Sequence, residues 1–444
     1  MTLNTKIIKA EINDQFLADD NRRPWIIGFS GGKDSTMLLQ LIWTAIKEIP
    51  AEIRDQRDIW IVCNNTLVEN PKIIQYTEKV LKQIEKAALE QGMPFRIQKT
   101  TPKLEDTFWI NVIGRGYPSP NNLFRWCTER LKINPTTKFI LEKVNENGEV
   151  IILLGTRTDE SANRAKSMKQ HEIFGQRLRK HILPNAYVFA PIKDVLTQDV
   201  WVYLNQVPSP WGANNKELVT LYKNANSGDC PLVIDDSTPS CGNSRFGCWV
   251  CTVVKRDKSM EGLIENGEEW MYPLLEIRDF LVTSRDEKEK YRERRRRNGE
   301  DRSDENIYGP YQPWVRAKIL KDVLKAQQQI QSIDPTINLI SHQELIAIQI
   351  LWYRDSIFNE RVSDIYNEIF NITEMKNDKF ETQKKKEVEL LKEVCSDKPQ
   401  HIPLIEELLS LQKSKMLLQR KHNLTKDIEK GLERFLENQT EEIS

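Results

Sequence analysis

The sequence predicts an α/β fold in which helices flank a mostly parallel, twisted sheet. From Pro24 onward, short apolar runs alternate with longer stretches of helical spacing. This alternation is typical of parallel strands joined by crossover helices. A later segment is rich in cysteine, and the chain from Ile337 onward has helical spacing with long charged intervals. We therefore expect an α/β unit, then a cysteine-rich segment, and then a C-terminal helical region.

The elements of the α/β unit are expected in a regular order. Apolar runs predict strands at 25–30, 58–64 and 149–157, with helices through 37–43 and 73–89. Phe189–Ile192 is expected to be the last strand, and Thr197, a good N-cap residue, is expected to begin the helix after it. Ligands of such folds collect at the carboxyl ends of the strands.

Length and composition indicate several domains in a soluble protein. The chain has 444 residues, of which 39% are hydrophobic and 29% charged, and 65 Lys and Arg balance 65 Asp and Glu. Any site for a polyanion must therefore be a local patch. The expected divisions are an α/β domain at 1–207, a cysteine-rich segment at 208–256, a charged helical or linker region at 257–336 and a helical domain at 337–444. The charged N-terminus and the lack of a long apolar run predict a cytoplasmic protein without a membrane span.

The segment Ser30–Ser35, with the sequence SGGKDS, is the strongest signal for a phosphate site. It follows an apolar strand and begins a helix, so its backbone N–H groups and the helix dipole face a bound anion. Gly31 and Gly32 let the backbone wrap closely round that anion. The spacing is neither a Walker A loop nor a dinucleotide fingerprint. It resembles the PP-loop of the ATP pyrophosphatases, which have an adenine nucleotide alpha hydrolase-like fold and cleave ATP between its α- and β-phosphates.

Two further elements resemble the phosphoadenylyl-sulfate reductase-like branch of that superfamily. Phe124–Thr128 with Lys132 resembles its R-W-C-T-x-x-x-K element, and Gly155–Arg157 through Glu160, Ser161 and Arg164 resembles its G-x-R-x-x-E-S-x-x-R element. The resemblance implies that these cations neutralise phosphate charge as pyrophosphate leaves. The implied ATP-binding residues are Ser30, Gly31, Gly32, Lys33, Asp34, Ser35, Arg125, Lys132, Gly155 and Glu160.

Cys230, Cys241, Cys248 and Cys251 form a quartet with the spacing C-x10-C-x6-C-x2-C in a turn-rich segment. Four thiolates can complete a tetrahedral zinc site or hold a 4Fe-4S cluster. We favour iron–sulfur, because zinc sites usually show two paired knuckles and only one C-x-x-C is present. Seven cysteines, an odd number, also fit a reducing compartment better than a disulfide framework.

Two other stretches have open interpretations. Cys127 stands between Arg125, Arg130 and Lys132, so it is either a low-pKa thiol that carries a persulfide or a packed structural cysteine. Residues 64–66 (Asn-Asn-Thr) end the second expected strand, where they either approach the nucleotide or cap the next helix.

The order of all these elements across residues 25 to 255 resembles the DndC family, the ATP pyrophosphatases of bacterial DNA phosphorothioation, which belong to restriction-modification systems. The resemblance implies that a DNA phosphate oxygen is adenylylated and then replaced by sulfur. Mg²⁺ would assist, with Asp34 either as its contact or as a carboxylate favoured by the helix dipole. The implied catalytic residues are Lys33, Asp34, Arg157, Arg164 and Cys127. The implied partners are DNA, a cysteine desulfurase as sulfur donor, and the phosphorothioation proteins DndD and DndE.

DNA contact needs basic surface near this site. Residues 177–181 and 294–297 are basic clusters that either supply it or are solvated surface. An iron–sulfur tRNA thiolase and a nucleotide-sensing subunit without turnover are the competing functions.

Overall fold

The computed structural model describes residues 3–18, 23–160, 165–166, 168, 176–225, 246–293, 308–355, 361–372 and 379–416, with 428, 429 and 432. By packing, the chain divides into a first unit of residues 1–108 and 120–279 and a second unit of residues 109–119 and 280–444. The described residues of the cysteine-rich segment, 208–225 and 246–256, fall in the first unit.

The first unit contains a six-stranded sheet in the order β3-β2-β1-β4-β6-β5. Its strands are β1 (Trp25–Gly28), β2 (Ile59–Asn64), β3 (Phe95–Thr100), β4 (Val150–Leu153), β5 (Arg179–Lys180) and β6 (Ala186–Phe189). Neighbouring strands are parallel, except that β5 pairs antiparallel with β6 at the edge. The predicted fold class, a mostly parallel sheet with flanking helices, is confirmed.

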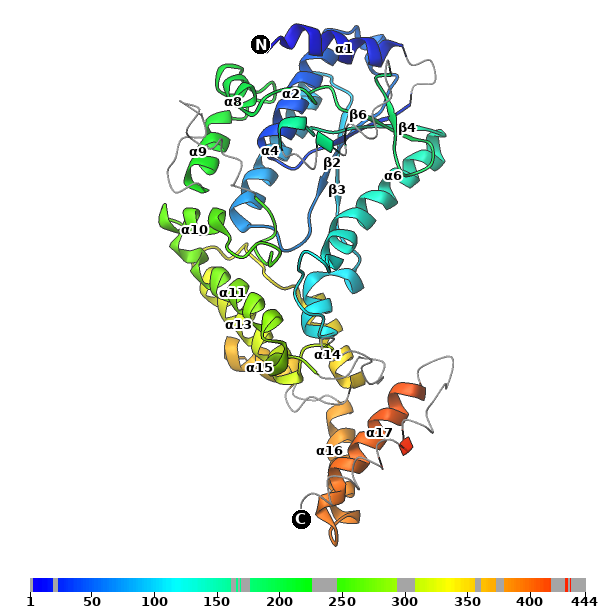
Figure 1. Ribbon diagram of the computed structural model, residues 1–444, viewed down its shortest axis with the longest axis vertical. Coiled ribbons are helices and arrows are strands. Elements are labelled where there is room, and N and C mark those ends of the chain that lie inside the picture. The colour runs from blue at the N-terminus through cyan, green and yellow to red at the C-terminus, as the bar shows by residue number, and fades with distance from the viewer. Residues whose placement is uncertain are drawn as a thin grey trace. The chain divides into compact units, whose positions relative to one another are not determined.

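Helices cover both faces of this sheet (Figure 1). One face packs against α1 (Thr5–Leu17), α2 (Lys33–Lys47), α4 (Pro71–Glu90), α8 (Thr197–Gln206) and α9 (Asn215–Ala225). The other face packs against α6 (Asn134–Asn147). Trp25 and Ile27 point into the first layer and Ile26 into the second, as the alternation of a strand requires. Being covered on both faces explains why β1 and β4 are almost wholly apolar.

The order of the strands reverses between β1 and β4. From β1 the chain moves to β2 and β3 on one side and then returns to β4 on the other. Such a reversal leaves a crevice at the carboxyl ends of the two central strands, which is where ligands bind in open α/β sheets. Ser30–Ser35 follows β1 and Gly155–Arg157 follows β4. The sheet therefore brings the PP-loop and the G-x-R element to one place.

Shorter elements complete the first unit. They are α3 (Ala51–Arg54), η1 (Leu104–Asp106), α5 (Trp126–Thr128), η3 (Glu129–Ile133), η4 (Thr158–Glu160), α10 (Lys258–Glu265), η5 (Glu269–Met271) and the start of α11 (Tyr272–Asp286).

The regular elements described in the second unit are helices, apart from an isolated antiparallel bridge between Arg292 and Tyr311. It contains η2 (Ile110–Gly114), α12 (Lys288–Tyr291), α13 (Pro313–Gln331), α14 (His342–Asp355), α15 (Val362–Phe370), α16 (Lys379–Val394), η6 (Pro399–His401) and α17 (Ile402–Met416). The π-helical η2 is tied to its neighbours by buried polar contacts, since Trp352 Nε1 donates to the Ile113 carbonyl at 3.0 Å and Arg316 Nε donates to the same oxygen at 2.7 Å. None of the described helices is long and apolar enough to cross a membrane.

Two expectations about local structure were wrong. Thr197 is the first residue of α8 and not its N-cap, which is Leu196, because the Thr197 hydroxyl and amide both bind Asp159 instead. The last parallel strand ends at Phe189, so the expected strand Phe189–Ile192 lies almost entirely after it. Pro191 has no N–H for a sheet ladder, which favours a turn at this point.

Candidate functional site

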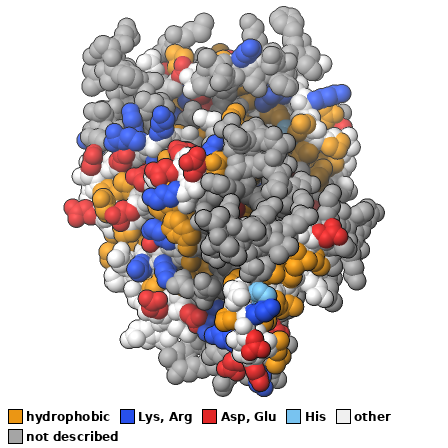
Figure 2. Space-filling view, turned by 60° about the horizontal axis from the view of Figure 1, so that its bottom comes forward, with side chains coloured by type: hydrophobic (Ala, Val, Ile, Leu, Met, Phe, Trp, Pro, Cys, Tyr) orange, Lys and Arg blue, Asp and Glu red, His pale blue; other side chains and the backbone are white. Residues whose placement is uncertain are grey.

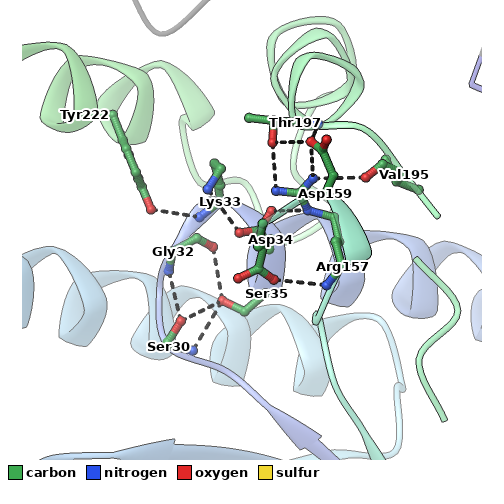
Figure 3. A network of polar contacts seen from close by, with 11 residues as sticks. Ser30, Gly32, Lys33, Asp34, Ser35, Arg157, Asp159, Val195, Thr197 and Tyr222 are labelled. Carbon is green, nitrogen blue, oxygen red and sulfur yellow. Dashed lines mark hydrogen bonds and ion pairs between the residues drawn. The ribbon is translucent and has the colours of Figure 1, made fainter. Parts of the chain in front are cut away.

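The PP-loop is closed by its own serines. The Ser30 amide donates to Ser35 Oγ at 3.2 Å, and Ser35 Oγ donates to the Gly32 carbonyl at 3.0 Å (Figure 3). Gly32 is the N-cap of α2 and supplies no side-chain cap to the first amides of the helix, of which the Lys33 amide lies 3.5 Å from the Tyr222 hydroxyl. A loop fixed in this way holds backbone donors and a helix N-terminus ready for an anion.

Gly31 is required by both its backbone conformation and its surroundings. Its φ is +72°, in the left-handed region that glycine tolerates. A Cβ at Gly31 would lie 2.5 Å from Oγ1 of Thr77 on α4. The loop therefore packs directly on α4, and a side chain at this position would push the two apart.

Arg157 joins the loop after β4 to the PP-loop. Its side chain is fully buried. Arg157 Nε donates to Asp34 Oδ1 at 2.7 Å, and its terminal nitrogens donate to the Val195 carbonyl at 2.9 Å and to Thr197 Oγ1 at 3.2 Å (Figure 3). The guanidinium also lies 3.4 Å from Asp159. Arg157 therefore holds Asp34, and through it the first turn of α2, in one orientation.

Asp159 is ionised in this network. Burial alone would raise its pKa, but two hydrogen bonds from Thr197 and the charge of Arg157 outweigh burial, so the pKa of Asp159 lies below its ordinary value. The Thr197 amide and hydroxyl donate to the carboxylate at 2.8 and 2.7 Å. The Arg157 amide donates to Glu160 Oε1 at 2.9 Å, so Glu160 also shapes this loop.

Lys33 and Asp34 form an ion pair at the opening of the loop. Lys33 Nζ lies 3.1 Å from Asp34 Oδ2 and 5.6 Å from the centre of the Tyr222 ring, and the Lys33 amide is 3.5 Å from the Tyr222 hydroxyl. Both charged side chains keep a little exposure, 16% for Lys33 and 19% for Asp34. Lys33 is therefore positioned to exchange its carboxylate partner for a phosphate.

The surroundings of the loop suit a nucleotide. Gly155 lies so close to α2 that a Cβ would be 3.0 Å from the Asp34 carbonyl. Thr156 Oγ1, next along the chain, is buried with no hydrogen-bond partner among the described residues. Asn64 Oδ1 and Thr100 Oγ1, which end the paired strands β2 and β3, are in the same condition. Unpaired buried polar atoms at the carboxyl edge are what a polar ligand would satisfy.

Cys248 lies against the segment after β2. Residues Glu69 and Cys248 form an isolated antiparallel bridge. The Cys248 thiol is 3.3 Å from Thr66 Oγ1 and donates to Glu69 Oε1 at 3.7 Å. Burial, and then the Glu69 carboxylate, raise the pKa of Cys248 to about 12. Residues 64–66 thus meet the cysteine-rich segment, and Asn70 caps α4 in their place.

Cys127 and Lys132 belong to the same neighbourhood. Lys132 Nζ lies 3.5 Å from Glu69 Oε1, and the Cys248 thiolate charge raises the pKa of Lys132 most strongly, ahead of Glu69 and Cys127. Burial raises the pKa of Cys127, and the charge of Cys251 adds to this, while Thr128, Lys132 and Arg125 oppose it. Lys132 is therefore the cation that can balance thiolate charge among these cysteines.

Cys248 and Cys251 share one tight turn, because the Cys251 amide donates to the Cys248 carbonyl at 3.0 Å. Arg278 on α11 holds the chain after this turn, donating to the carbonyls of Cys251 at 3.1 Å and Lys255 at 2.7 Å. Cys230 and Cys241 lie outside the described residues. Within the described residues no group of three His, Cys, Asp or Glu is placed to hold a metal. Cys248 and Cys251 are the members of the quartet that the structure describes, and they lie at the two ends of this turn.

Other predicted site residues are placed apart or not described. Arg125 is exposed at the end of the turn that precedes Trp126. Ser161, Arg164 and residues 294–297 lie outside the described residues. The basic stretch 177–181 includes strand β5, and Arg177 pairs with Glu11 at 3.7 Å and Asp14 at 3.6 Å. That arginine is occupied within the protein.

Several residues that build the site were not predicted from the sequence. These residues are Glu69, Thr77, Asp159, Thr197, Tyr222 and Arg278. Of these residues, Asp159 would have been the easiest to predict from the sequence, because it lies within the G-x-R-x-x-E element. Glu69 lies in the segment after β2, the others lie on helices, and none of them is part of a motif.

A family model, that of the phosphoadenosine phosphosulfate reductase domain, matches residues 24–254. An uncharacterized protein of Methanocaldococcus jannaschii is 29% identical over 234 residues, which are 53% of this chain and 37% of that protein. The chain thus spans little more than a third of the curated relative it matches.

Two solved structures show weak likeness. One is a phosphoadenylyl-sulfate reductase from Candida auris in a phosphate complex, with 14% identity, a TM-score of 0.26 and coverage of 47% of this chain and 91% of that one. The other is a U34-tRNA thiolase, NcsA, from Methanococcus maripaludis with its 4Fe-4S cluster, with 16% identity, a TM-score of 0.29 and coverage of 63% and 78%. At these TM-scores neither carries an argument about function.

Proposed function

We propose, from the premise that this chain belongs to the phosphoadenosine phosphosulfate reductase domain family, that it is an ATP pyrophosphatase that adenylylates a DNA backbone phosphate for sulfur replacement. One observation supports the assignment of ATP as the substrate. The PP-loop and the loop after β4 are joined by the hydrogen bond from Arg157 to Asp34, which is 2.7 Å long. The DNA half rests on the resemblance of the motifs, in their order, to the DndC family.

The first step is transfer of AMP. A non-bridging oxygen of a DNA phosphodiester attacks the α-phosphorus of ATP, the bond from that phosphorus to the α–β bridging oxygen breaks, and pyrophosphate leaves with the electron pair. The amides of the PP-loop and Lys33 stabilise the negative charge that develops on the leaving group. Arg157 is buried and engaged within the protein, so it is a positioning residue that acts through Asp34.

Asp34 would be the residue that holds Mg²⁺, in exchange for its contact with Lys33. Asp34 Oδ1 accepts from Arg157 and Oδ2 accepts from Lys33, so a cation at Oδ2 would take the place of Lys33. That exchange would free the ammonium group for the β- and γ-phosphates. Mg²⁺ is usually held by one or two carboxylates together with substrate phosphates, which fits a single available carboxylate oxygen.

The second step replaces oxygen by sulfur. The terminal sulfur of a persulfide, which a cysteine desulfurase supplies and Cys127 holds, attacks the activated DNA phosphorus, and AMP leaves. A second thiol then attacks the Cys127 sulfur, so that the phosphorothioate departs and a disulfide remains, which a thiol reductant restores. DndD and DndE are proposed as further partners.

The cysteine quartet is proposed to hold a 4Fe-4S cluster. Cys248 and Cys251 supply one knuckle, and Lys132 beside Cys248 lowers the cost of gathering thiolate charge. A bound cluster would supply redox or sulfur-relay chemistry. The visible spectrum of anaerobically purified protein tests this assignment. A colourless protein with stoichiometric zinc would refute it.

Pyrophosphate release from ATP, measured with duplex DNA, with tRNA and with neither, tests the proposed activity. We expect duplex DNA to stimulate release and tRNA not to. Stimulation by tRNA alone would show a tRNA thiolase, and ATP binding without AMP production would show a nucleotide-sensing subunit. Mass spectrometry of cellular DNA should find phosphorothioate linkages with the wild-type protein and none with Lys33→Ala.

A further inference from the structure

An apolar turn stands exposed in front of the R-W-C-T element. Leu123 has 98% of its surface exposed and Phe124 has 46%. Large apolar side chains on a surface are common singly, but two in succession at the tip of one turn make a small apolar patch. We call residues 121–125 the Asn121 turn.

The Asn121 turn is fixed in shape by its own hydrogen bonds. Asn121 Oδ1 accepts from the amides of Leu123 at 2.9 Å and Phe124 at 2.8 Å, and the Asn121 amide donates to the Phe124 carbonyl at 3.3 Å. An asparagine that binds amides two and three residues ahead is a strong turn-former. The two apolar side chains are therefore presented by a defined backbone.

Both ends of the Asn121 turn are anchored in the first unit. On one side the Pro120 carbonyl accepts from the buried Thr252 hydroxyl at 2.6 Å. On the other side Trp126 is buried and stacks on Phe108, with ring centres 5.6 Å apart and planes at 20°. Thr252 directly follows Cys251, so the turn is joined to the cysteine-rich segment.

The charges round the turn suit a polyanion. Arg125 is exposed within the turn itself, and Lys132 and Arg130 follow on η3. Arg130 lies 3.8 Å from Asp106, and Glu129 is an exposed acid among these cations. The Lys132 carbonyl accepts from Asn64 Nδ2 at 3.1 Å, which places this segment at the carboxyl end of β2, beside the PP-loop strand.

We propose that the Asn121 turn inserts Leu123 and Phe124 against the stacked bases of duplex DNA while Arg125 binds a flanking phosphate. The inference rests on the proposed function and deepens it, because it names the element that presents a backbone phosphate to the activated ATP. Apolar wedges flanked by cations are a known means of unstacking a base step, and cations give affinity through phosphates. On the face in Figure 2, basic and acidic side chains are interspersed over the described residues.

Leu123→Ala/Phe124→Ala tests the inference in the full-length protein. Leu89→Ala is the matched control, because Leu89 is 81% exposed and lies near the C-terminal end of α4, away from the carboxyl edge of the sheet. Fluorescence anisotropy at fixed salt should show the double variant binding duplex DNA roughly tenfold to a hundredfold more weakly, since stacking on one side chain is worth about 1–3 kcal/mol. Leu89→Ala should bind as the wild type does.

Two further measurements distinguish insertion of Leu123 and Phe124 between bases from attraction of cations to the DNA phosphates. DNA carrying 2-aminopurine should brighten with the wild type, as the base unstacks, and not with the double variant. Arg125→Gln should reduce the salt dependence of binding by about one phosphate contact, whereas Leu123→Ala/Phe124→Ala should leave that slope unchanged. The double variant should lower the unfolding midpoint only slightly, because Leu123 buries almost nothing and Phe124 is 46% exposed.

The outcomes that overturn the inference are distinct from failure of the proposed function. If the wild type shows DNA-stimulated pyrophosphate release and the double variant binds DNA equally well, only the wedge is wrong. If the double variant keeps its DNA affinity but loses persulfide transfer from a cysteine desulfurase, the turn is a protein-docking site and the assignment to DNA is wrong. If no DNA stimulates the wild type, the proposed function itself fails.

Discussion

Arg157 is a buried cation that joins several parts of the site through contacts within the protein. Its nitrogens bind two carboxylates, a carbonyl and a hydroxyl, and these partners come from the PP-loop, from its own loop and from the start of α8. A guanidinium suits this task because its donors have a fixed planar arrangement that several acceptors can share. Removing it would leave the Asp34 and Asp159 carboxylates without their common cation.

Arg157→Met is therefore expected to lower the free energy of unfolding by about 3–5 kcal/mol, the usual cost of breaking a buried pair from one side. Pyrophosphate release should be lost with it. Arg157→Lys keeps the charge but loses the planar set of donors. Its free energy of unfolding should therefore lie between those of the wild type and Arg157→Met. Arg177→Met is the control, since Arg177 is 31% exposed and a surface pair contributes about 0–1 kcal/mol. Urea unfolding measures the costs, and equal values for Arg157→Met and Arg177→Met would contradict this role.

Asp159 makes the stability of the protein depend on pH in the acid range. Its folded pKa is depressed, so its contribution to stability is present above the unfolded pKa and is lost as pH falls through the lower folded value. Thr197→Val removes the hydroxyl that donates to the carboxylate at 2.7 Å, and the folded pKa should rise toward the unfolded one. The variant should then be less stable than the wild type at pH 7, and the two should converge at a pH below both pKa values. A difference in unfolding free energy that stays constant with pH would count against this explanation.

At the scale of elements, the PP-loop depends on a single backbone conformation and on the helix behind it. Gly31→Ala should cost more than the strain of a left-handed alanine, about 1–2 kcal/mol, because the new methyl group would also meet Thr77. Gly148→Ala is the matched control, since Gly148 has φ +83° at the end of α6 and nothing lies within 4 Å of its Cβ position. Only Gly31→Ala should abolish pyrophosphate release.

The double variant Gly31→Ala/Thr77→Ala refines this prediction. It removes the methyl-to-hydroxyl clash and keeps the backbone strain, so it should regain part of the stability that Gly31→Ala loses. Urea unfolding of the four proteins measures both contributions. If Thr77→Ala gives no recovery, the packing of the loop on α4 is not the source of the cost.

The elements that the sequence predicted correctly were those with a strong local signal. The apolar runs of β1, β2 and β4 are buried on both faces, and SGGKDS lies between strand and helix as expected. β3 was not predicted, because FRIQKT is a polar edge strand whose burial depends on its neighbour. Thr197 is a residue type that is favoured at N-caps, but its hydroxyl donates to the carboxylate of Asp159, which lies far from it in the sequence. Partners from other parts of the chain are not visible in a local pattern.

At the scale of the whole molecule, the two units are interleaved along the chain. Residues 109–119 leave the first unit, pack in the second, and are followed by a return at Pro120. Composition placed this segment within the expected α/β domain at 1–207, because a local pattern does not show which core buries it. Trp109 Nε1 donates to the Leu339 carbonyl at 2.7 Å, which connects residues 109–119 to a residue far along the chain.

This interleaving predicts how the first unit behaves without the second. A chain that ends at Asp286, after α11, would expose Trp109, Val112 and Ile113, which are fully buried in the whole protein. We expect it to self-associate. The same truncation with residues 109–119 replaced by a Gly/Ser segment of equal length should stay monomeric in sedimentation and still release pyrophosphate, because the PP-loop, Arg157 and their partners all belong to the first unit.

If the truncation with its native residues 109–119 is equally monomeric, that segment does not need the second unit for its burial. If the replaced form is monomeric but inactive, the second unit contributes to the ATP reaction itself.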